Sequence, residues 1–406
     1  MTTTLSRRAF VQALAGATTV VAARAGTAPD LVVSIERRTI WKGRDGGTSW
    51  FHPRGCVVPG SKPAVLMTLQ PITGSDNFGQ VHWTTSSDLG RTWNEPAPID
   101  ALARRDIGGG FEEGVCDVVP QFHPPTGTVL AMGHNVYYLK NKLTKPAEDR
   151  WPVYVVRSAD GGWSERKKLV WNDARATAIY TSNCGQRLVL ENGDVLLALS
   201  FGPKGRKDRG VTTARCSFDG RTLAIKETGD ELRNTAGRGL LEPSLTRWGG
   251  RFFLTIRAED GHGYVSVSDD GLRWAEAKPW TFDDGEVLTM STTQQHWLEH
   301  SERLHLVYTR KTVENAKVIR YRAPIFMAAV DTKMLRLVRA TERVMFPMIG
   351  DPAGAPEHVA AMGNFHPIIV TPDEAWITVG EERSRDGWRG DTLLARIRWS
   401  RPNRSV

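Results

Sequence analysis

Long apolar runs are absent from this chain of 406 residues. The apolar segment near the start, residues 10–23, is interrupted by Gln12 and by several Gly and Thr residues. It is shorter than the roughly 20 apolar residues that a membrane-spanning helix needs. No segment repeats its apolar residues with a convincing helical period. We therefore expect no transmembrane helix, no membrane partner and a chain built mainly from strands.

Cysteine is scarce as well. The chain has four, widely spaced and without a CxxC pair: Cys56, Cys116, Cys184 and Cys216. Paired cysteines at short spacing are the usual sign of a structural zinc site. The sequence therefore indicates no metal site and no other cofactor. Whether the four thiols pair as disulfides stays open.

Charge of one sign is also missing. The chain has 53 Lys and Arg against 45 Asp and Glu, a formal charge of +8. Residues 1–25 hold three of the arginines and no acid, so the remainder carries +5. Basic residues are interleaved with acidic ones and form no block of the kind that binds nucleic acid. We expect no nucleic-acid partner, although a locally positive pocket for an acidic ligand is compatible with this composition.

The first 25 residues resemble a twin-arginine export signal. Arg7 and Arg8 precede a segment of small apolar residues, which ends at Ala23-Arg24-Ala25, a cleavage site of the A-x-A form. The alternative is a ragged terminus with two chance arginines. We expect residues 1–25 to be removed on export to the periplasm or medium, and residues 26–406 to form a single, monomeric domain.

A turn motif recurs along the chain at residues 86–93, 158–163, 217–223 and 268–274, each time after a strand-like run. Its first copy reads Ser-Ser-Asp-Leu-Gly-Arg-Thr-Trp. Ser and Asp side chains can accept hydrogen bonds from backbone N–H groups in such a turn, Gly adopts a positive φ, and the terminal Trp or Leu packs on a neighbouring sheet. We interpret the motif as a structural element rather than a catalytic one.

The copies begin 72, 59 and 51 residues apart, which suits the four-stranded units of a propeller. Grouping the strand-like runs between them gives six units. The sequence therefore predicts an all-β fold, a six-bladed β-propeller of four-stranded antiparallel blades. We expect residues 31–41 to add a strand to the last blade and close the ring.

Inner strands of a propeller converge on its axis, so their polar residues are candidates for a shared site. Arg54 lies at the start of blade 1, Glu242 and Arg257 lie in blade 4, and Arg322 lies in blade 5. Histidines also recur near expected inner strands, at His52, His296 and His366. A single Arg is more often a surface ion-pair partner and a single His more often a packing residue, so only their combination indicates a site.

Turns that have the form of Asp boxes occur together with six blades and this ordered Arg, Glu, Arg, Arg series. In these features residues 31–400 resemble the sialidase superfamily. The resemblance implies that Arg54, Arg257 and Arg322 clamp the carboxylate of an acidic glycan. Guanidinium groups suit this role because they stay charged and pair bidentately with carboxylates. It also implies that Asp76, in the Ser-Asp-Asn-Phe-Gly loop, is the acid/base residue, although that loop is equally good turn chemistry.

The family's nucleophile is a Tyr at the start of the last inner strand. A Glu of the family activates this Tyr, and Glu242 matches that Glu. This chain has Phe365 or His366 at that position. A Phe365→Tyr substitution would then supply the missing hydroxyl, whereas His366 would act as a base or proton donor, with His52 and His296 contacting the substrate.

We therefore expect an exo-glycoside hydrolase for a terminal acidic sugar. The alternatives are a propeller lyase or hydrolase for another uronic or ulosonic acid, and a non-catalytic carbohydrate-binding propeller.

Overall fold

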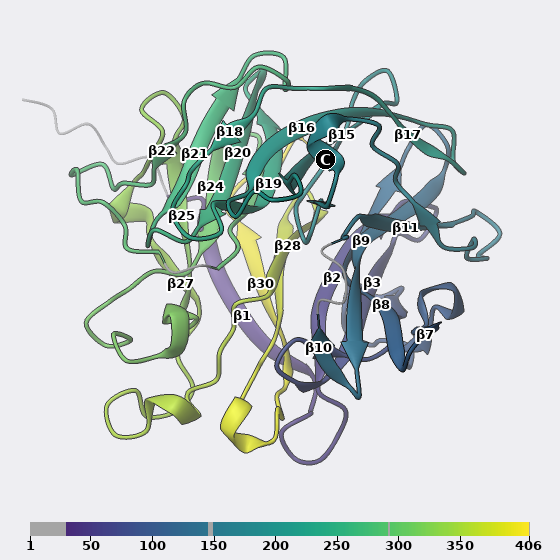
Figure 1. Cartoon of the computed structure of the whole chain (residues 1–406). Helices are drawn as coiled ribbons and strands as arrows, with labels where there is room; N and C mark the ends of the chain where they lie inside the picture. Colours follow the sequence, from purple (N-terminus) through teal and green to yellow (C-terminus); the bar gives the residue numbers. More distant parts are fainter. Residues whose placement is uncertain (1–29, 145–148, 291–292, 406) are drawn as a thin grey trace, which may run out of the picture.

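The computed structural model describes residues 30–144, 149–290 and 293–405. Six antiparallel sheets form a ring around a central axis (Figure 1). This confirms the predicted six-bladed propeller, with four to six strands per blade. The expected export signal, residues 1–25, lies outside the described residues.

Blades 1 to 3 follow one another along the chain, each with its innermost strand first apart from the short β7. Blade 1 consists of β2 (Trp50–Val58), β3 (Ala64–Gly74), β4 (Asn77–Phe78), β5 (His82–Ser86) and β6 (Ala97–Pro98). Blade 2 consists of β7 (Arg105–Gly108), β8 (Phe111–His123), β9 (Thr128–Leu139), β10 (Lys142–Thr144), β11 (Pro152–Arg157) and β12 (Lys167–Lys168). Blade 3 consists of β13 (Ile179–Thr181), β14 (Leu188–Val189), β15 (Val195–Gly202), β16 (Gly210–Phe218), β17 (Leu223–Thr228) and β18 (Leu232–Arg233).

Blades 4 to 6 complete the ring. Blade 4 consists of β19 (Leu240–Trp248), β20 (Arg251–Ala258), β21 (Gly263–Ser268) and β22 (Lys278–Pro279). Blade 5 consists of β23 (His296–His300), β24 (Arg303–Tyr308), β25 (Ile325–Asp331), β26 (Arg336–Leu337) and β27 (Arg343–Phe346). Blade 6 consists of β28 (Phe365–Thr371), β29 (Glu374–Gly380), β30 (Thr392–Trp399) and β1 (Val32–Trp41).

The predicted closing strand is confirmed. β1 pairs with β30 in antiparallel register, from Val32 opposite Trp399 to Trp41 opposite Thr392. The segment nearest the start of the described chain thus becomes the outermost strand of the last blade.

Helical structure is limited to short 3-10 turns in the described part of the chain, and no helix there has both the length and the apolar character needed to cross a bilayer. The turns are Asp100–Leu102, Ala174–Ala176, Ile319–Tyr321, Arg339–Thr341, Pro356–His358 and Ser384–Asp386. All four cysteines are free thiols, and three of them are buried.

Each seam between neighbouring blades has its own apolar cluster. Leu130 and Tyr154 of blade 2, for example, pack with Leu197 and Phe201 of blade 3. Strands such as Val195–Gly202 are buried along their whole length, because each blade has two faces and both are covered by a neighbour. The blades are therefore held together by burial of apolar area.

The recurring turns link each blade to the preceding one. In the turn at residues 86–93, Oδ1 of Asp88 accepts hydrogen bonds from two backbone N–H groups, and the Trp93 ring lies 6.1 Å from that of Trp376 in blade 6. In the turn at residues 268–274, Nε1 of Trp274 donates to Oγ1 of Thr213 in blade 3 at 2.9 Å. These contacts fit the structural role expected for the motif.

Candidate active site

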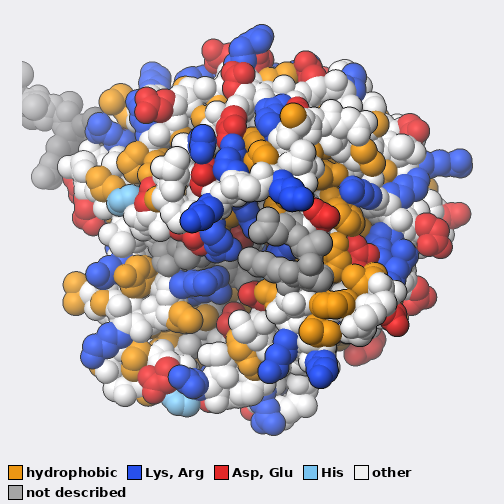
Figure 2. All heavy atoms as spheres, viewed as in Figure 1, with side chains coloured by type: hydrophobic (Ala, Val, Ile, Leu, Met, Phe, Trp, Pro, Cys, Tyr) orange, Lys and Arg blue, Asp and Glu red, His pale blue; other side chains and the backbone are white. Residues whose placement is uncertain are grey.

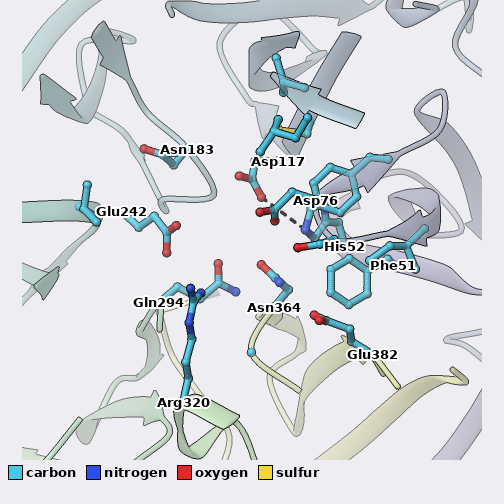
Figure 3. Close-up of a pocket in the computed structure, with 18 of the residues that line it drawn as sticks. Phe51, His52, Asp76, Asp117, Asn183, Glu242, Gln294, Arg320, Asn364 and Glu382 are labelled. Atoms are coloured by element: carbon cyan, nitrogen blue, oxygen red, sulfur yellow. Dashed lines mark ion pairs between the residues drawn. The ribbon is translucent and has the colours of Figure 1, made fainter. Parts of the chain in front are cut away.

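A cavity of about 330 Å³ opens on the propeller axis, at the end where most inner strands begin. Polar side chains from all six blades line its wall. One from each blade, taken in blade order, gives His52, Asp117, Asn183, Glu242, Gln294 and Asn364 (Figure 3), which we call the axial ring.

Four members of the axial ring have a left-handed backbone, with φ of 53° at His52, 59° at Asp117, 47° at Asn183 and 44° at Glu242. Three of these lie at β-bulges, where the pairing of β2, β8 and β19 with the next strand shifts register. A bulge adds one residue to a strand and redirects a side chain. Left-handed backbone at residues other than Gly costs of order 1–3 kcal/mol each and clusters at functional sites. Its recurrence in four blades marks this ring as the candidate site.

The structure brings five of the eight residues singled out from the sequence to this cavity: His52, Asp76, Glu242, Arg257 and Arg322. Asp76 lies at the tip of the β3–β4 turn, whereas Glu242 lies on β19, and Figure 3 shows the two carboxylates on opposite sides of the cavity.

Arg54, His296 and His366 do not line the cavity. All three are buried: Arg54 and His296 are 0% exposed and His366 is 4% exposed. The side chain that reaches the cavity at the start of blade 6 is Asn364, whereas Phe365 is buried against His296 with ring centroids 5.6 Å apart. The structure thus places neither Phe365 nor His366 where the missing Tyr was expected.

Each arginine of the predicted clamp faces a carboxylate of the chain itself. Nη2 of Arg54 donates to Oδ1 of Asp117 at 2.7 Å.

Arg257 donates to Glu242, and Nη1 of Arg322 lies 3.6 Å from Oε2 of Glu382. Burial raises the pKa of Glu382, and Arg322 offsets this only in part. Burial also lowers the pKa of Arg322. Arg322 makes no hydrogen bond to Glu382 at this distance, whereas Arg257 donates to Glu242, so Arg322 is easier to redirect towards a ligand than Arg257.

The histidines near the axis are neutral at pH 7. Burial, with Arg54 nearby, lowers the pKa of both His52 and His296 to about 3. Burial likewise lowers the pKa of His366, whose ring lies 5.3 Å from that of His296. Such histidines do not act as proton donors near neutral pH.

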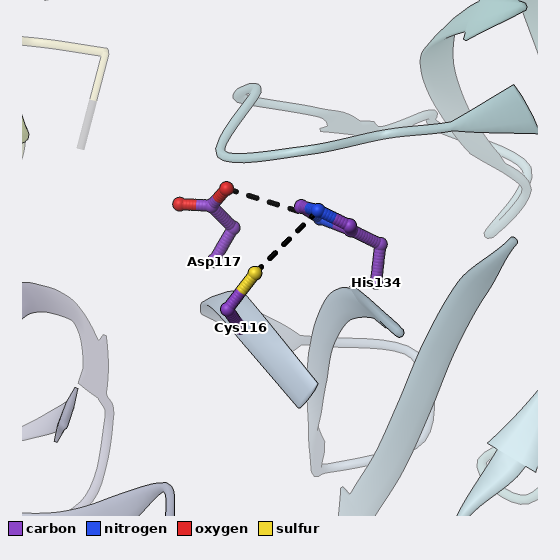
Figure 4. Close-up of side chains that lie close together, drawn as sticks. All are labelled: Cys116, Asp117 and His134. Carbon is purple, nitrogen blue, oxygen red and sulfur yellow. Dashed lines mark hydrogen bonds and ion pairs between the residues drawn. The ribbon is translucent and has the colours of Figure 1, made fainter. Parts of the chain in front are cut away.

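Asp117 also belongs to the cluster of Cys116, Asp117 and His134, whose ligand-type atoms lie within 4.8 Å of one another (Figure 4). Sγ of Cys116 is 3.5 Å from Nε2 of His134, and Nδ1 of His134 is 3.8 Å from Oδ2 of Asp117. These donor types suit zinc. Arg54 already holds Asp117, however, and the surrounding charge is positive, so the local field opposes a cation.

Positive charge dominates the cavity wall. Six arginines line it, against four carboxylates, among the described residues. The arginines are Arg150, Arg209, Arg238, Arg257, Arg320 and Arg322, and the carboxylates are Asp76, Asp117, Glu242 and Glu382. Figure 2 shows Lys and Arg side chains gathered around the middle of this face. A concave site with this balance attracts anions.

Sequence reasoning missed Asp117, Asn183, Gln294 and Asn364, as well as the arginines on blades 2 and 3. One signal was present for Asp117, an acidic residue inside the otherwise apolar run Val115-Cys116-Asp117-Val118-Val119. A charge inside an apolar run of an inner strand indicates a side chain that faces the axis.

Comparison with solved structures supports the fold. The chain is similar to the Trypanosoma rangeli sialidase, with a TM-score of 0.62 and 16% identity over 90% of this chain and 60% of that one. It is also similar to a Hadza microbial sialidase, with a TM-score of 0.61 and 16% identity over 88% of this chain and 68% of that one. This chain therefore spans about 60% of the length of the Trypanosoma enzyme.

A protein of unknown function from Dyadobacter fermentans matches over 91% of this chain and 100% of its own length, with a TM-score of 0.61 and 12% identity. No protein-family model and no curated protein sequence matches the chain. At such identities the comparisons show the fold, which is the propeller of sialidases.

Proposed function

We propose that this chain is an exported, sialidase-like exo-glycoside hydrolase that acts on a terminal acidic sugar. The observation that carries the proposal is an arginine-rich cavity with two facing carboxylates, at the axis of a propeller whose fold is that of sialidases. One of the similar structures is the Trypanosoma rangeli sialidase in complex with sialic acid, at 16% identity and a TM-score of 0.61.

The carboxylate of the sugar would bind to arginines on blades 4 and 5. Arg257 and Arg322 line the cavity, and Arg320 lies beside Arg322 as an exposed side chain. Arg54 would act indirectly by positioning Asp117, since it is buried behind the axial ring. The expected clamp had three arginines in contact with the carboxylate. The proposed one has two arginines that contact it and a third, Arg54, that positions Asp117.

Bond cleavage would then rest on Asp76 and Glu242. No Tyr lines the cavity among the described residues, so a water molecule is the candidate nucleophile. Two carboxylates on opposite sides of a glycosidic bond can divide the work, one protonating the leaving oxygen and the other activating water. Asp76 is the candidate acid, because its loop is exposed at the cavity mouth, and Glu242 the candidate base.

A hydrolysis assay with a fluorogenic sialoside tests this assignment. We expect Asp76→Asn and Glu242→Gln each to lower kcat by about a hundredfold or more, with Glu276→Gln, an exposed residue of blade 4, as the matched control. Arg257→Ala and Arg322→Ala should weaken substrate binding by about tenfold. Absence of both turnover and binding for every acidic sugar tried would overturn the proposal.

A second candidate is a non-catalytic carbohydrate-binding propeller, favoured because, among the described residues, Asn364 and no Tyr reaches the cavity from the start of blade 6. Binding of an acidic sugar without turnover would support it. Formation of an unsaturated product from a uronic-acid polysaccharide would instead indicate a lyase.

A further inference from the structure

Arg150 and Arg209 occupy equivalent positions in neighbouring blades. Arg150 lies shortly before β11 and pairs with Ile179 of blade 3. Arg209 lies directly before β16 and pairs with Gly239, next to the inner strand of blade 4. Each arginine thus stands at a seam, and both line the cavity.

The backbone holds both arginines firmly. The N–H of Arg209 donates to the carbonyl of Arg238 at 2.9 Å, and its carbonyl accepts from Leu240 at 3.0 Å. The N–H of Arg150 donates to Ala178 at 3.2 Å, and its carbonyl accepts from Tyr180 at 2.9 Å. The two side chains therefore start from fixed points on the cavity wall.

Their guanidinium groups have no hydrogen-bonded or ion-paired partner among the residues that the structure describes. Arg257 and Arg322, by contrast, face Glu242 and Glu382. Arg150 and Arg209 are both half-buried. Burial, with Arg150 and Arg238 nearby, lowers the pKa of Arg209 to about 10. Like charges held together in a partly desolvated site raise the free energy of the unliganded protein, and a bound anion relieves this.

We propose that Arg150 and Arg209 form a second oxyanion subsite, which binds a sulfate, phosphate or further carboxylate on the sugar next to the terminal one. The proposal rests on the proposed function for the terminal acidic sugar. The subsite lies at the seams of blades 2, 3 and 4 and borders Arg257 of blade 4, whereas Arg320 and Arg322 belong to blade 5. A guanidinium fork binds each of these oxyanions bidentately. The substrate class is thereby narrowed to glycans with two neighbouring acidic groups.

Calorimetric titration with matched ligands tests the subsite. The probes are a sialylgalactoside, its 6-O-sulfated and 6-O-phosphorylated derivatives, and the same glycoside carrying a second sialic acid. We expect at least one doubly acidic ligand to bind wild-type protein about tenfold more tightly than the singly acidic one. Arg150→Gln and Arg209→Gln should each abolish that difference and change binding of the singly acidic ligand by less than about twofold.

The control is Arg221→Gln, which removes an exposed arginine at the opposite end of β16 and should leave the difference intact. Equal affinity of wild-type protein for all four ligands would overturn the proposal. An equal loss for singly and doubly acidic ligands in Arg209→Gln would also overturn it, because the two arginines would then serve the terminal sugar.

If wild-type protein binds none of these glycans, the proposed function fails. A separate measurement then tests whether Arg150 and Arg209 bind an anion. Sodium sulfate should then raise the unfolding temperature of wild-type protein and of Arg221→Gln above that in sodium chloride of equal ionic strength. It should not do so for Arg209→Gln. Equal effects of sulfate on Arg209→Gln and wild-type protein would overturn the subsite as well.

Discussion

Arg54 and Asp117 form an ion pair between the inner strands of blades 1 and 2, with Nη2 of the arginine 2.7 Å from Oδ1 of the carboxylate. The arginine is 0% exposed. Burial alone would raise the pKa of Asp117, but Arg54, His52 and His134 lower it further than burial raises it. The pair therefore stabilises the seam between blades 1 and 2 and also fixes the orientation of Asp117 in the axial ring.

Removal of the Asp117 carboxylate should leave Arg54 as an uncompensated buried charge. We expect Asp117→Leu to lower the free energy of unfolding by about 3–5 kcal/mol, measured by urea denaturation. The control is Asp269→Leu, which breaks the exposed pair with Arg251 and should cost less than about 1 kcal/mol. Similar losses in the two variants would contradict a structural role for the buried pair.

Gly239 allows the close approach of blade 4 to Arg209. A Cβ at Gly239 would lie 2.4 Å from the carbonyl oxygen of Arg209, and its φ is +74°. Gly249 has a φ of +56° but open space around its Cβ. We expect Gly249→Ala to cost about 1 kcal/mol from backbone strain alone, and Gly239→Ala to cost clearly more. Thermal unfolding of the two variants provides the measurement. Equal losses of stability in both would contradict the expectation.

Phe365→Tyr should not create the missing nucleophile, contrary to the expectation from sequence. The ring is 0% exposed and lies off the cavity, so a new hydroxyl would have to fit into a packed interior. We expect the variant to lose about 1–3 kcal/mol of stability from overpacking with unchanged turnover of a fluorogenic sialoside. A rise in turnover would show that residue 365 reaches the substrate.

Binding of an anion should depend on the protonation of Glu382. Its pKa is raised above the usual 4.5, so the folded chain binds this proton more readily than the unfolded chain. Its contribution to stability is therefore present at low pH and lost as the pH rises through the folded pKa. Protonation also frees Arg322 for the terminal carboxylate, so affinity for an acidic sugar that stays ionised in this range should increase as the pH falls towards that pKa. Titrations at several pH values should show this in wild-type protein and a weaker dependence in Glu382→Gln; parallel curves would rule out the coupling.

Export is expected to depend on Arg7 and Arg8. Their joint replacement by Lys preserves charge but removes the guanidinium pair of the twin-arginine signal, so the protein should accumulate in the cytoplasm. Immunoblots of cell fractions provide the measurement, with Arg24→Lys as a control outside the pair. Unchanged export of the double variant would argue against this route.

The fold was predictable because each blade is a local unit. Period-two apolar runs, the recurring turns and the Val32–Trp41 strand contain enough information to count six blades and close the ring. The side chains facing the axis were harder to predict. A bulge such as that between Phe51 and Arg54 shifts every later residue to the opposite face. For this reason His52 reaches the cavity and Arg54 does not.

The missed arginines have a different cause. Arg150 and Arg209 lie outside the inner strands and reach the site only because each blade docks on the next. No short sequence pattern encodes that docking, so the anion-binding wall of blades 2 to 4 becomes visible only in three dimensions.

The pairing of β1 with β30 within blade 6 also sets how the ring responds to mechanical force. Val32 lies opposite Trp399, so the chain segments that flank this pair leave the sheet at the same end. Tension applied to both would load the interstrand hydrogen bonds one after another, since these bonds run perpendicular to the strands. The pair would peel open like a zipper instead of resisting in shear. An unfolding motor that pulls against these two segments would therefore meet its weakest resistance within blade 6, and β1 would detach from β30 before the seams between blades were strained.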